Sequence, residues 1–205
     1  MIQVTKLPTL ILFNGPPRVG KDLATTCLLS HIAKFGKSSC QLEFKKFLRQ
    51  MAIDFSELTV EQANAIEFGG NKDAPHHNIP KGRSWRQWLI HISENVIKPI
   101  FGSIAFGELM LRDINLHWLP MDYIVISDCG FTEEVKVLSD AGFPMCVIRL
   151  HRDGHTFQND SREYIYIEGM HSIDMHNNGS KAELKDAVEA MFNARSVYED
   201  SRGSP

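Results

Sequence analysis

The sequence predicts an α/β fold of three layers, in which a five-stranded parallel sheet carries helices on both faces. Two observations support this. Short runs of almost continuous apolar residues alternate with longer segments in which apolar residues recur at helical spacing. Such runs are typical of strands that are buried on both faces, and right-handed crossovers between them leave few arrangements other than a parallel sheet.

Composition and charge narrow the class of protein. The chain has 205 residues, 43% of them apolar and 23% charged, which suits one soluble domain over 1–205. A net charge of −3 gives no overall field for a nucleic acid or an anionic membrane, so we expect neither as a partner. No run approaches the roughly 20 apolar residues of a membrane span. The four cysteines lack metal-binding spacing, and we expect reduced thiols in a cytoplasmic protein.

The first part of the chain reads as strand, loop and helix, followed by a second strand and a helical region. Residues 69–82 form the loosest stretch, rich in glycine, asparagine and histidine. Pro99 and Gly102 are expected to separate the two helices that follow it. We interpret residues 54–118 as a helical insertion between strands two and three. The expected elements are a strand at 9–14, a helix at 21–35, a strand at about 39–44, and helices at 45–53, 59–68, 84–97 and 106–118.

The second part returns to alternation of strands and helices. The final helix is preceded by Asn177, Asn178, Gly179 and Ser180, which suit a turn and a helix cap. A polar tail is expected over 199–205. The expected elements are strands at 122–127 and 144–150, a fifth strand within 164–175, and helices at 131–141 and 181 to about 197.

The loop after the first strand has the pattern of a phosphate-binding loop. Gly15, Gly20 and Lys21 satisfy G-x-x-x-x-G-K, in which backbone N–H groups surround a β-phosphate and the lysine reaches the β- and γ-phosphates of ATP. The N-terminus of the next helix directs its dipole at the same anion. The alternative is an ordinary turn between strand and helix. The candidate nucleotide-binding residues here are Gly15, Arg18, Val19, Gly20, Lys21 and Asp22.

Two aspartates are candidate ligands for Mg²⁺. Asp22 stands where serine or threonine usually assists the metal, and a carboxylate is also a hard oxygen ligand. Asp128 follows an apolar run and stands at the carboxyl end of the third strand, where a second magnesium-organising carboxylate belongs. The alternative for Asp128 is an N-cap for the helix at 131–141.

These motifs together resemble the deoxynucleoside monophosphate kinases of tailed bacteriophages, which are related to phosphomevalonate kinase. The resemblance covers roughly residues 9–195, and its most specific elements are the Gly-Lys-Asp loop and the segment Asp-x-x-Phe-x-x-Glu that begins at Asp128. It implies transfer of the γ-phosphoryl group of MgATP to a small-molecule deoxynucleoside monophosphate, for DNA precursor supply in the host cytoplasm. A homodimer is left open.

Residue by residue, the resemblance gives catalytic roles to Lys21, Asp128 and Arg152, with a lid at about 152–171. Arg86 resembles an arginine at a helix start that faces the monophosphate, and Glu94 resembles an acidic residue further along that helix. Asn178 and Gly179 are expected on the ATP side. The expected acceptor-binding residues are Lys46, Arg49, Arg83, Arg86 and Glu94.

One departure from the family concerns Gly130, where the family usually has arginine. The phosphate or base contact that an arginine would make there is missing, or Arg83 or Arg112 supplies it. Two other functions therefore stay open. One is a kinase of the same fold that acts on another small phosphorylated acceptor, and the other is an inactive protein that binds or sequesters nucleotides.

Overall fold

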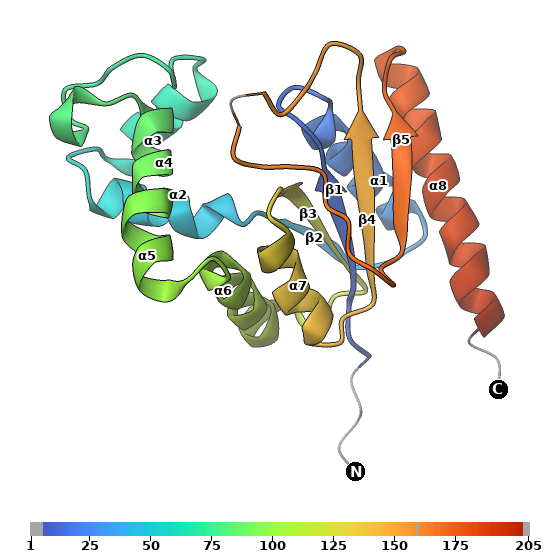
Figure 1. Cartoon of the computed structure of the whole chain (residues 1–205). Helices are drawn as coiled ribbons and strands as arrows, with labels where there is room; N and C mark the ends of the chain where they lie inside the picture. Colours follow the sequence, from blue (N-terminus) through green and yellow to red (C-terminus); the bar gives the residue numbers. More distant parts are fainter. Residues whose placement is uncertain (1–5, 159, 203–205) are drawn as a thin grey trace.

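The computed structural model describes residues 6–158 and 160–202. Its sheet has five parallel strands in the order β2–β3–β1–β4–β5, which confirms the predicted sheet (Figure 1). Because all strands run in one direction, their carboxyl ends meet at the same edge of the sheet. The strands are β1 (Thr9–Asn14), β2 (Ser39–Leu42), β3 (Tyr123–Cys129), β4 (Met145–His151) and β5 (Ser172–His176).

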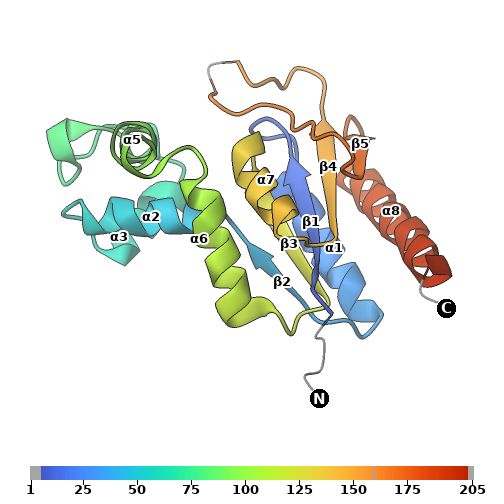
Figure 2. The same ribbon diagram turned by 60° about the horizontal axis from the view of Figure 1, so that its bottom comes forward.

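Helices cover both faces of this sheet. Alternate residues of β1 enter two separate cores: Ile11 and Phe13 pack toward α1 and α8, whereas Leu10 and Leu12 pack toward α6 and α7. Figures 1 and 2 show these pairs of helices on opposite faces. Burial on both sides explains why the strands are apolar throughout. The helices are α1 (Lys21–Lys34), α6 (Ala105–Asp113), α7 (Thr132–Asp140) and α8 (Lys181–Arg202).

The helical insertion lies between β2 and β3 and extends beside the edge strand β2 (Figures 1 and 2). It includes the helix that follows β2, so it is taken below as residues 45–118 and not 54–118. Thr59 and Ser84 cap two of its helices, each in a capping box with the glutamine three residues later. The Trp88 indole donates to the carbonyl of Ala52 at 2.9 Å and ties α4 to α2. Its further helices are α2 (Lys45–Asp54), α3 (Val60–Phe68), α4 (Trp85–Ile92) and α5 (Lys98–Phe101).

Two helix ends differ from the prediction. The chain does not break at Pro99: a π-helical turn at Ser93–Ile97 leads into α5, which continues through Pro99 and ends before Gly102. The wider turn accommodates a residue that has no N–H donor. At the other end, α8 continues to Arg202, because no glycine or proline interrupts the predicted tail before residue 203. Residues 203–205 lie outside the described part of the chain.

The segment 152–171, called the strap below, connects β4 to β5. Figure 1 shows it crossing above the carboxyl ends of β1 and β3 toward the insertion. Asn14, at the end of β1, fixes its second half: the side-chain amide donates to the carbonyl of Glu163 and accepts from the N–H of Ile165, both at 3.0 Å. The same amide donates to the carbonyl of Cys129 at 3.0 Å. Within the described residues, no helix has the length and apolar character needed to cross a membrane.

Candidate phosphate-binding site

The loop between β1 and α1 has a backbone that few residues other than glycine can adopt. Gly20 has a φ of 105°, and a Cβ atom there would lie 2.5 Å from the Asn177 side-chain nitrogen. A Cβ atom on Gly15 would lie 2.7 Å from the carbonyl oxygen of Leu150. Arg18 adopts a left-handed φ of 64°. Both glycines therefore allow the loop to curl tightly against the ends of β4 and β5.

Lys21 begins α1 and turns its ammonium group back into the loop. The Nζ atom donates to the carbonyl oxygens of Gly15 at 2.6 Å and Pro16 at 2.8 Å. Burial, and then the positive charge of Arg162, lower the pKa of Lys21 to about 8. The ammonium group thus lies in a partly dry, electropositive place and has neutral carbonyls as its hydrogen-bond partners, an environment that favours a bound anion.

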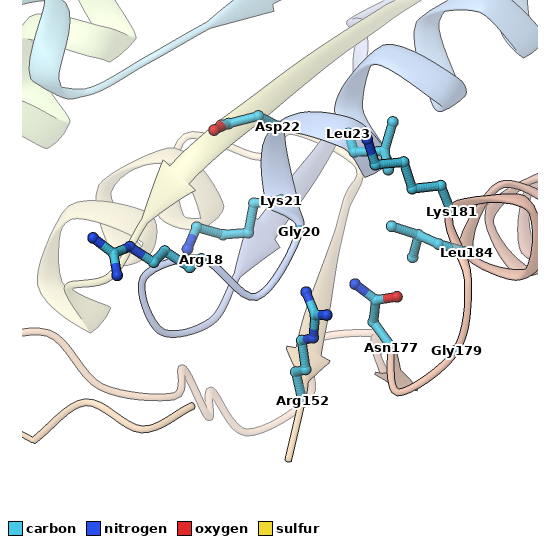
Figure 3. Close-up of a pocket in the computed structure, with 10 residues that line it drawn as sticks. All are labelled: Arg18, Gly20, Lys21, Asp22, Leu23, Arg152, Asn177, Gly179, Lys181 and Leu184. Carbon is cyan, nitrogen blue, oxygen red and sulfur yellow. The ribbon is translucent and has the colours of Figure 1, made fainter. Parts of the chain in front are cut away.

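A pocket of about 370 Å³ opens beside this loop. In Figure 3, Arg152 and Asn177 point into it from the ends of β4 and β5, while Arg18 points to the opposite side of the loop. Asn177 also donates to the carbonyl of Val19 at 2.8 Å, which joins the loop before α8 to the phosphate-binding loop. The pocket is lined by Arg18, Gly20, Lys21, Asp22, Leu23, Arg152, Asn177, Gly179, Lys181 and Leu184.

Five of the eight predicted nucleotide-binding residues line this pocket, and Gly15, Val19 and Asn178 do not. Val19 is fully buried and contributes its carbonyl group. The Asn178 side chain turns to the strap and accepts from the N–H of Asp153 at 2.9 Å. Asn177, its neighbour, takes the place in the pocket that we expected for Asn178. Sequence alone could not separate two adjacent asparagines in one turn.

The two predicted magnesium ligands have different surroundings. Asp22 is exposed in the first turn of α1 and lines the pocket. Asp128 lies within β3 and accepts hydrogen bonds from the N–H groups of Phe44 and Lys45, both at 2.9 Å. Burial raises the pKa of Asp128 to about 6. Asp128 therefore caps α2, and the alternative of a cap for α7 is wrong.

These carboxylates fit a magnesium ion that also binds phosphate. Within the described residues, no group of three or more His, Cys, Asp and Glu side chains forms a metal site. Mg²⁺ in nucleotide sites usually takes one or two carboxylates, with phosphate oxygens and water completing its shell. Asp22 suits that role directly, and Asp128 keeps lone pairs beyond the two hydrogen bonds that it accepts.

The predicted acceptor-binding residues lie on the insertion, where each has a partner. Lys46 pairs with Asp113 at 3.0 Å, Arg49 with Glu67 at 2.8 Å, and Arg86 with Asp73 at 2.6 Å. Glu94 pairs with Lys98 at 2.7 Å, and Arg83 donates to the carbonyl of Pro80 at 3.0 Å while it lies over the Trp88 ring. None of the five lines the pocket beside the phosphate-binding loop.

The Arg86–Asp73 pair lies within electrostatic reach of the phosphate-binding loop. Besides the hydrogen bond from Arg86, the charge of Arg18 contributes to the lowered pKa of Asp73. Asp73 is on the insertion and Arg18 is in the loop, so the two regions approach each other at this point.

Arg162 is a cation whose position the sequence did not reveal. A Cβ atom on Gly130 would lie 2.5 to 2.8 Å from three carbon atoms of the Arg162 side chain, which therefore crosses directly over Gly130. Arg162 of the strap, which we did not consider for this role, lies over position 130; whether a contact there is missing or comes from Arg83 or Arg112 stays a prediction. Only the folding of the strap onto β3, across more than 30 residues of sequence, brings them together.

Neither a known family model nor a curated protein matches the sequence significantly. The solved structures similar to this chain include Mycobacterium tuberculosis APS kinase CysC in complex with AMPPNP and APS (13% identity, 92% of this chain and 99% of that one, TM-score 0.48). A sugar kinase from Janibacter sp. HTCC2649 shows 12% identity over 91% of this chain and 95% of that one, with a TM-score of 0.45. At such identities and TM-scores they carry no argument about activity.

The fold itself is decided by this chain's own features. A parallel sheet with the order β2–β3–β1–β4–β5 places the glycine loop directly after its central strand and before α1. The chain has a P-loop NTPase fold. A designed protein of that fold is also among the similar structures, with 12% identity over 91% of this chain and 92% of that one and a TM-score of 0.40.

Proposed function

We propose that this protein is a kinase that transfers the γ-phosphoryl group of MgATP to a nucleoside monophosphate, and in particular to a deoxynucleoside monophosphate. The observation that carries the proposal is that the phosphate-binding loop and the Arg86–Asp73 pair of the insertion come within electrostatic reach of each other. Lys21 and Arg18 belong to the loop, and Arg86, next to Asp73, belongs to the insertion. Phosphoryl transfer depends on such positioning of two phosphate-bearing ligands.

On the donor side, the loop amides and Lys21 would hold the β- and γ-phosphates of ATP. The two carbonyl contacts of the Lys21 ammonium can be exchanged for phosphate oxygens, which are stronger, charged acceptors. Asp22 and Asp128 would hold the magnesium ion, which neutralises charge on the β- and γ-phosphate oxygens. Arg152, exposed at the pocket, adds a further cation.

On the acceptor side, Arg86 stands in the first turn of α4, where the helix dipole also favours an anion. An oxygen of the acceptor's phosphate forms a bond to the γ-phosphorus, the bond from that phosphorus to the β–γ bridging oxygen breaks, and ADP leaves with the electron pair. The choice of a deoxynucleotide rests on the family resemblance of the Gly-Lys-Asp loop and the segment from Asp128.

A coupled assay of ADP release tests this function. The panel contains ribo- and deoxynucleoside monophosphates together with non-nucleotide phosphorylated acceptors, each at saturating MgATP. We expect stimulation by at least one deoxynucleoside monophosphate and little by the non-nucleotides. Stimulation by a non-nucleotide acceptor alone would assign another substrate class to the same fold. ATP binding without stimulation by any acceptor would point to a nucleotide-binding protein that is not a kinase.

A further inference from the structure

The position of Arg162 is fixed by the backbone on either side of it. The N–H of Glu163 donates to the carbonyl of Gly130 at 3.2 Å, and the Asn14 amide binds Glu163 and Ile165. The strap is thus anchored to the ends of β1 and β3 immediately after Arg162. The Arg162 side chain is half-buried over Gly130, at the edge of the sheet where the phosphate-binding loop begins.

The charge of Arg162 acts on Lys21. After burial, the charge of Arg162 is the largest cause of the lowered pKa of Lys21. Asp128 is among the groups that raise the pKa of Arg162. This agrees with the position of the Arg162 side chain over Gly130, directly after β3. Two partly buried cations repel each other, and an anion between them would relieve that repulsion.

Asp160 orients the guanidinium through one edge. Arg162 donates from Nε to Oδ1 of Asp160 at 2.8 Å and from Nη2 to Oδ2 at 2.5 Å. The Arg162 backbone N–H also donates to Asp160 Oδ1 at 3.0 Å. Among the described residues Nη1 has no hydrogen-bond partner, and the edge formed by Nη1 and Nη2 keeps donors that a phosphate can accept.

We propose that Arg162 is a catalytic residue that binds the γ-phosphoryl group of ATP opposite Lys21, and that Asp160 is the positioning residue that holds its guanidinium. This inference rests on the proposed function, since it assigns the arginine to the transferring group. The strap thereby contributes the cation that Gly130 does not provide. Gly130 is small because the Arg162 side chain crosses it.

Calorimetric binding of MgATP and MgADP to the full-length protein tests the proposal without any acceptor. ATP carries the γ-phosphate and ADP does not, so Arg162→Ala should weaken ATP binding about 10- to 100-fold and ADP binding less than threefold. Arg162→Lys, which keeps the charge and the apolar stem, should fall between wild type and Arg162→Ala. Lys136→Ala removes an exposed cation of α7 and serves as the control that changes neither affinity.

The outcomes separate this proposal from the proposed function. A selective loss of ATP binding supports the role of Arg162 even if no acceptor stimulates ADP release. Equal losses for ATP and ADP, or a lowered melting temperature in both Arg162 variants, would make Arg162 structural. Unchanged ATP binding in Arg162→Ala would overturn the assignment. Where an acceptor is active, kcat of Arg162→Ala should fall about 10³-fold.

Two double variants sharpen the result. Gly130 has no left-handed φ, and the three atoms nearest to a Cβ atom there all belong to the Arg162 side chain. Gly130→Arg combined with Arg162→Ala should therefore recover about tenfold of the lost ATP affinity, and no recovery would mean that the cation must come from the strap. Asp160→Ala should weaken ATP binding three- to tenfold in wild type and not at all in Arg162→Ala. Equal effects in both backgrounds would remove the positioning role.

Discussion

The phosphate-binding loop and the helical insertion hold their cations in opposite ways. In the loop, Lys21 is partly buried, and its ammonium is bound by neutral carbonyl groups. In the insertion, Lys46, Arg49 and Arg86 are each paired with a carboxylate. The loop is therefore left with unbalanced positive charge, whereas the insertion is locally neutral.

This difference predicts different costs of binding an anion. A phosphate at the loop replaces weak dipolar contacts and also reduces repulsion between Lys21 and Arg162. A phosphate at Arg86 must compete with Asp73 for the same guanidinium. Exposed ion pairs contribute little to stability, typically about 0 to 1 kcal/mol. A phosphate can therefore displace Asp73 from Arg86, but the displacement lowers acceptor affinity. We therefore expect the loop to bind its ligand with less adjustment than the insertion.

The largest expected effect comes from removing the loop cation. Lys21→Ala should lower kcat by about 10²-fold or more, because the ammonium balances charge that develops on the transferring phosphate. Its melting temperature should stay close to that of wild type. Burial disfavours the charged form of Lys21, so removing this charge offsets the contacts that are lost. Steady-state kinetics and thermal unfolding measure the two quantities. Turnover within a few-fold of wild type would contradict the assignment of the loop.

Arg86→Ala tests the other side of the comparison. A charged hydrogen bond to phosphate is worth roughly 1.5 to 3 kcal/mol, so acceptor binding should weaken about 10- to 150-fold. ATP affinity should be nearly unchanged, because Arg86 belongs to the insertion and does not line the loop pocket. Calorimetry with ATP and with the preferred monophosphate measures both. Equal losses for both ligands would mean that Arg86 is structural.

The pH dependence of ATP binding tests the electropositive character of the loop. Burial and Arg162 lower the pKa of Lys21 to about 8, so the ammonium loses its proton at a lower pH than an ordinary lysine. ATP affinity should therefore stay high below pH 8 and fall about tenfold as the pH rises from 7 to 9. Asp128, with a pKa of about 6, titrates below this window. In Lys21→Ala the decline should vanish, and its persistence would assign it to another group.

The smallest expected effect comes from releasing Arg86. Asp73→Asn removes the carboxylate that competes with phosphate, so acceptor affinity should rise by a few-fold. ATP affinity should rise less, because Asp73 pairs with Arg86 and is only within the wider influence of Arg18. Acceptor titrations at two salt concentrations measure this, and the gain should shrink at high salt. A weaker acceptor affinity would show that Asp73 positions Arg86.

The sequence predicted best what depends on neighbouring residues. The apolar run of β1 and the glycine loop that follows it are local patterns, and the structure places both as expected. The sequence did not predict contacts between residues that lie far apart along the chain. Asp128 has the pattern of a cap for the helix that follows it, yet its partners are amides of α2, more than 80 residues away in sequence.

Buried charge was equally hard to predict. Glu134, in the first turn of α7, has the sequence pattern of an exposed acid beside a helix dipole. It is only 3% exposed, and burial raises its pKa to about 8. The packing of α6 against this turn, where a Cβ atom on Gly107 would lie 2.7 Å from the Glu134 carbonyl oxygen, decides its environment. No local pattern reports such a tertiary contact.

The three hydrogen bonds of Asn14 have a consequence for which sequences this fold accepts. Its amide nitrogen serves two carbonyl groups and its oxygen serves one N–H group, all at a fully buried position. Aspartate would direct an oxygen at two carbonyl oxygens, leucine would leave all three backbone groups unsatisfied, and glutamine would need space that the core does not offer. Asparagine is therefore nearly the only one of the twenty amino acids that suits position 14. This position lies outside the glycine-lysine pattern that identifies a phosphate-binding loop.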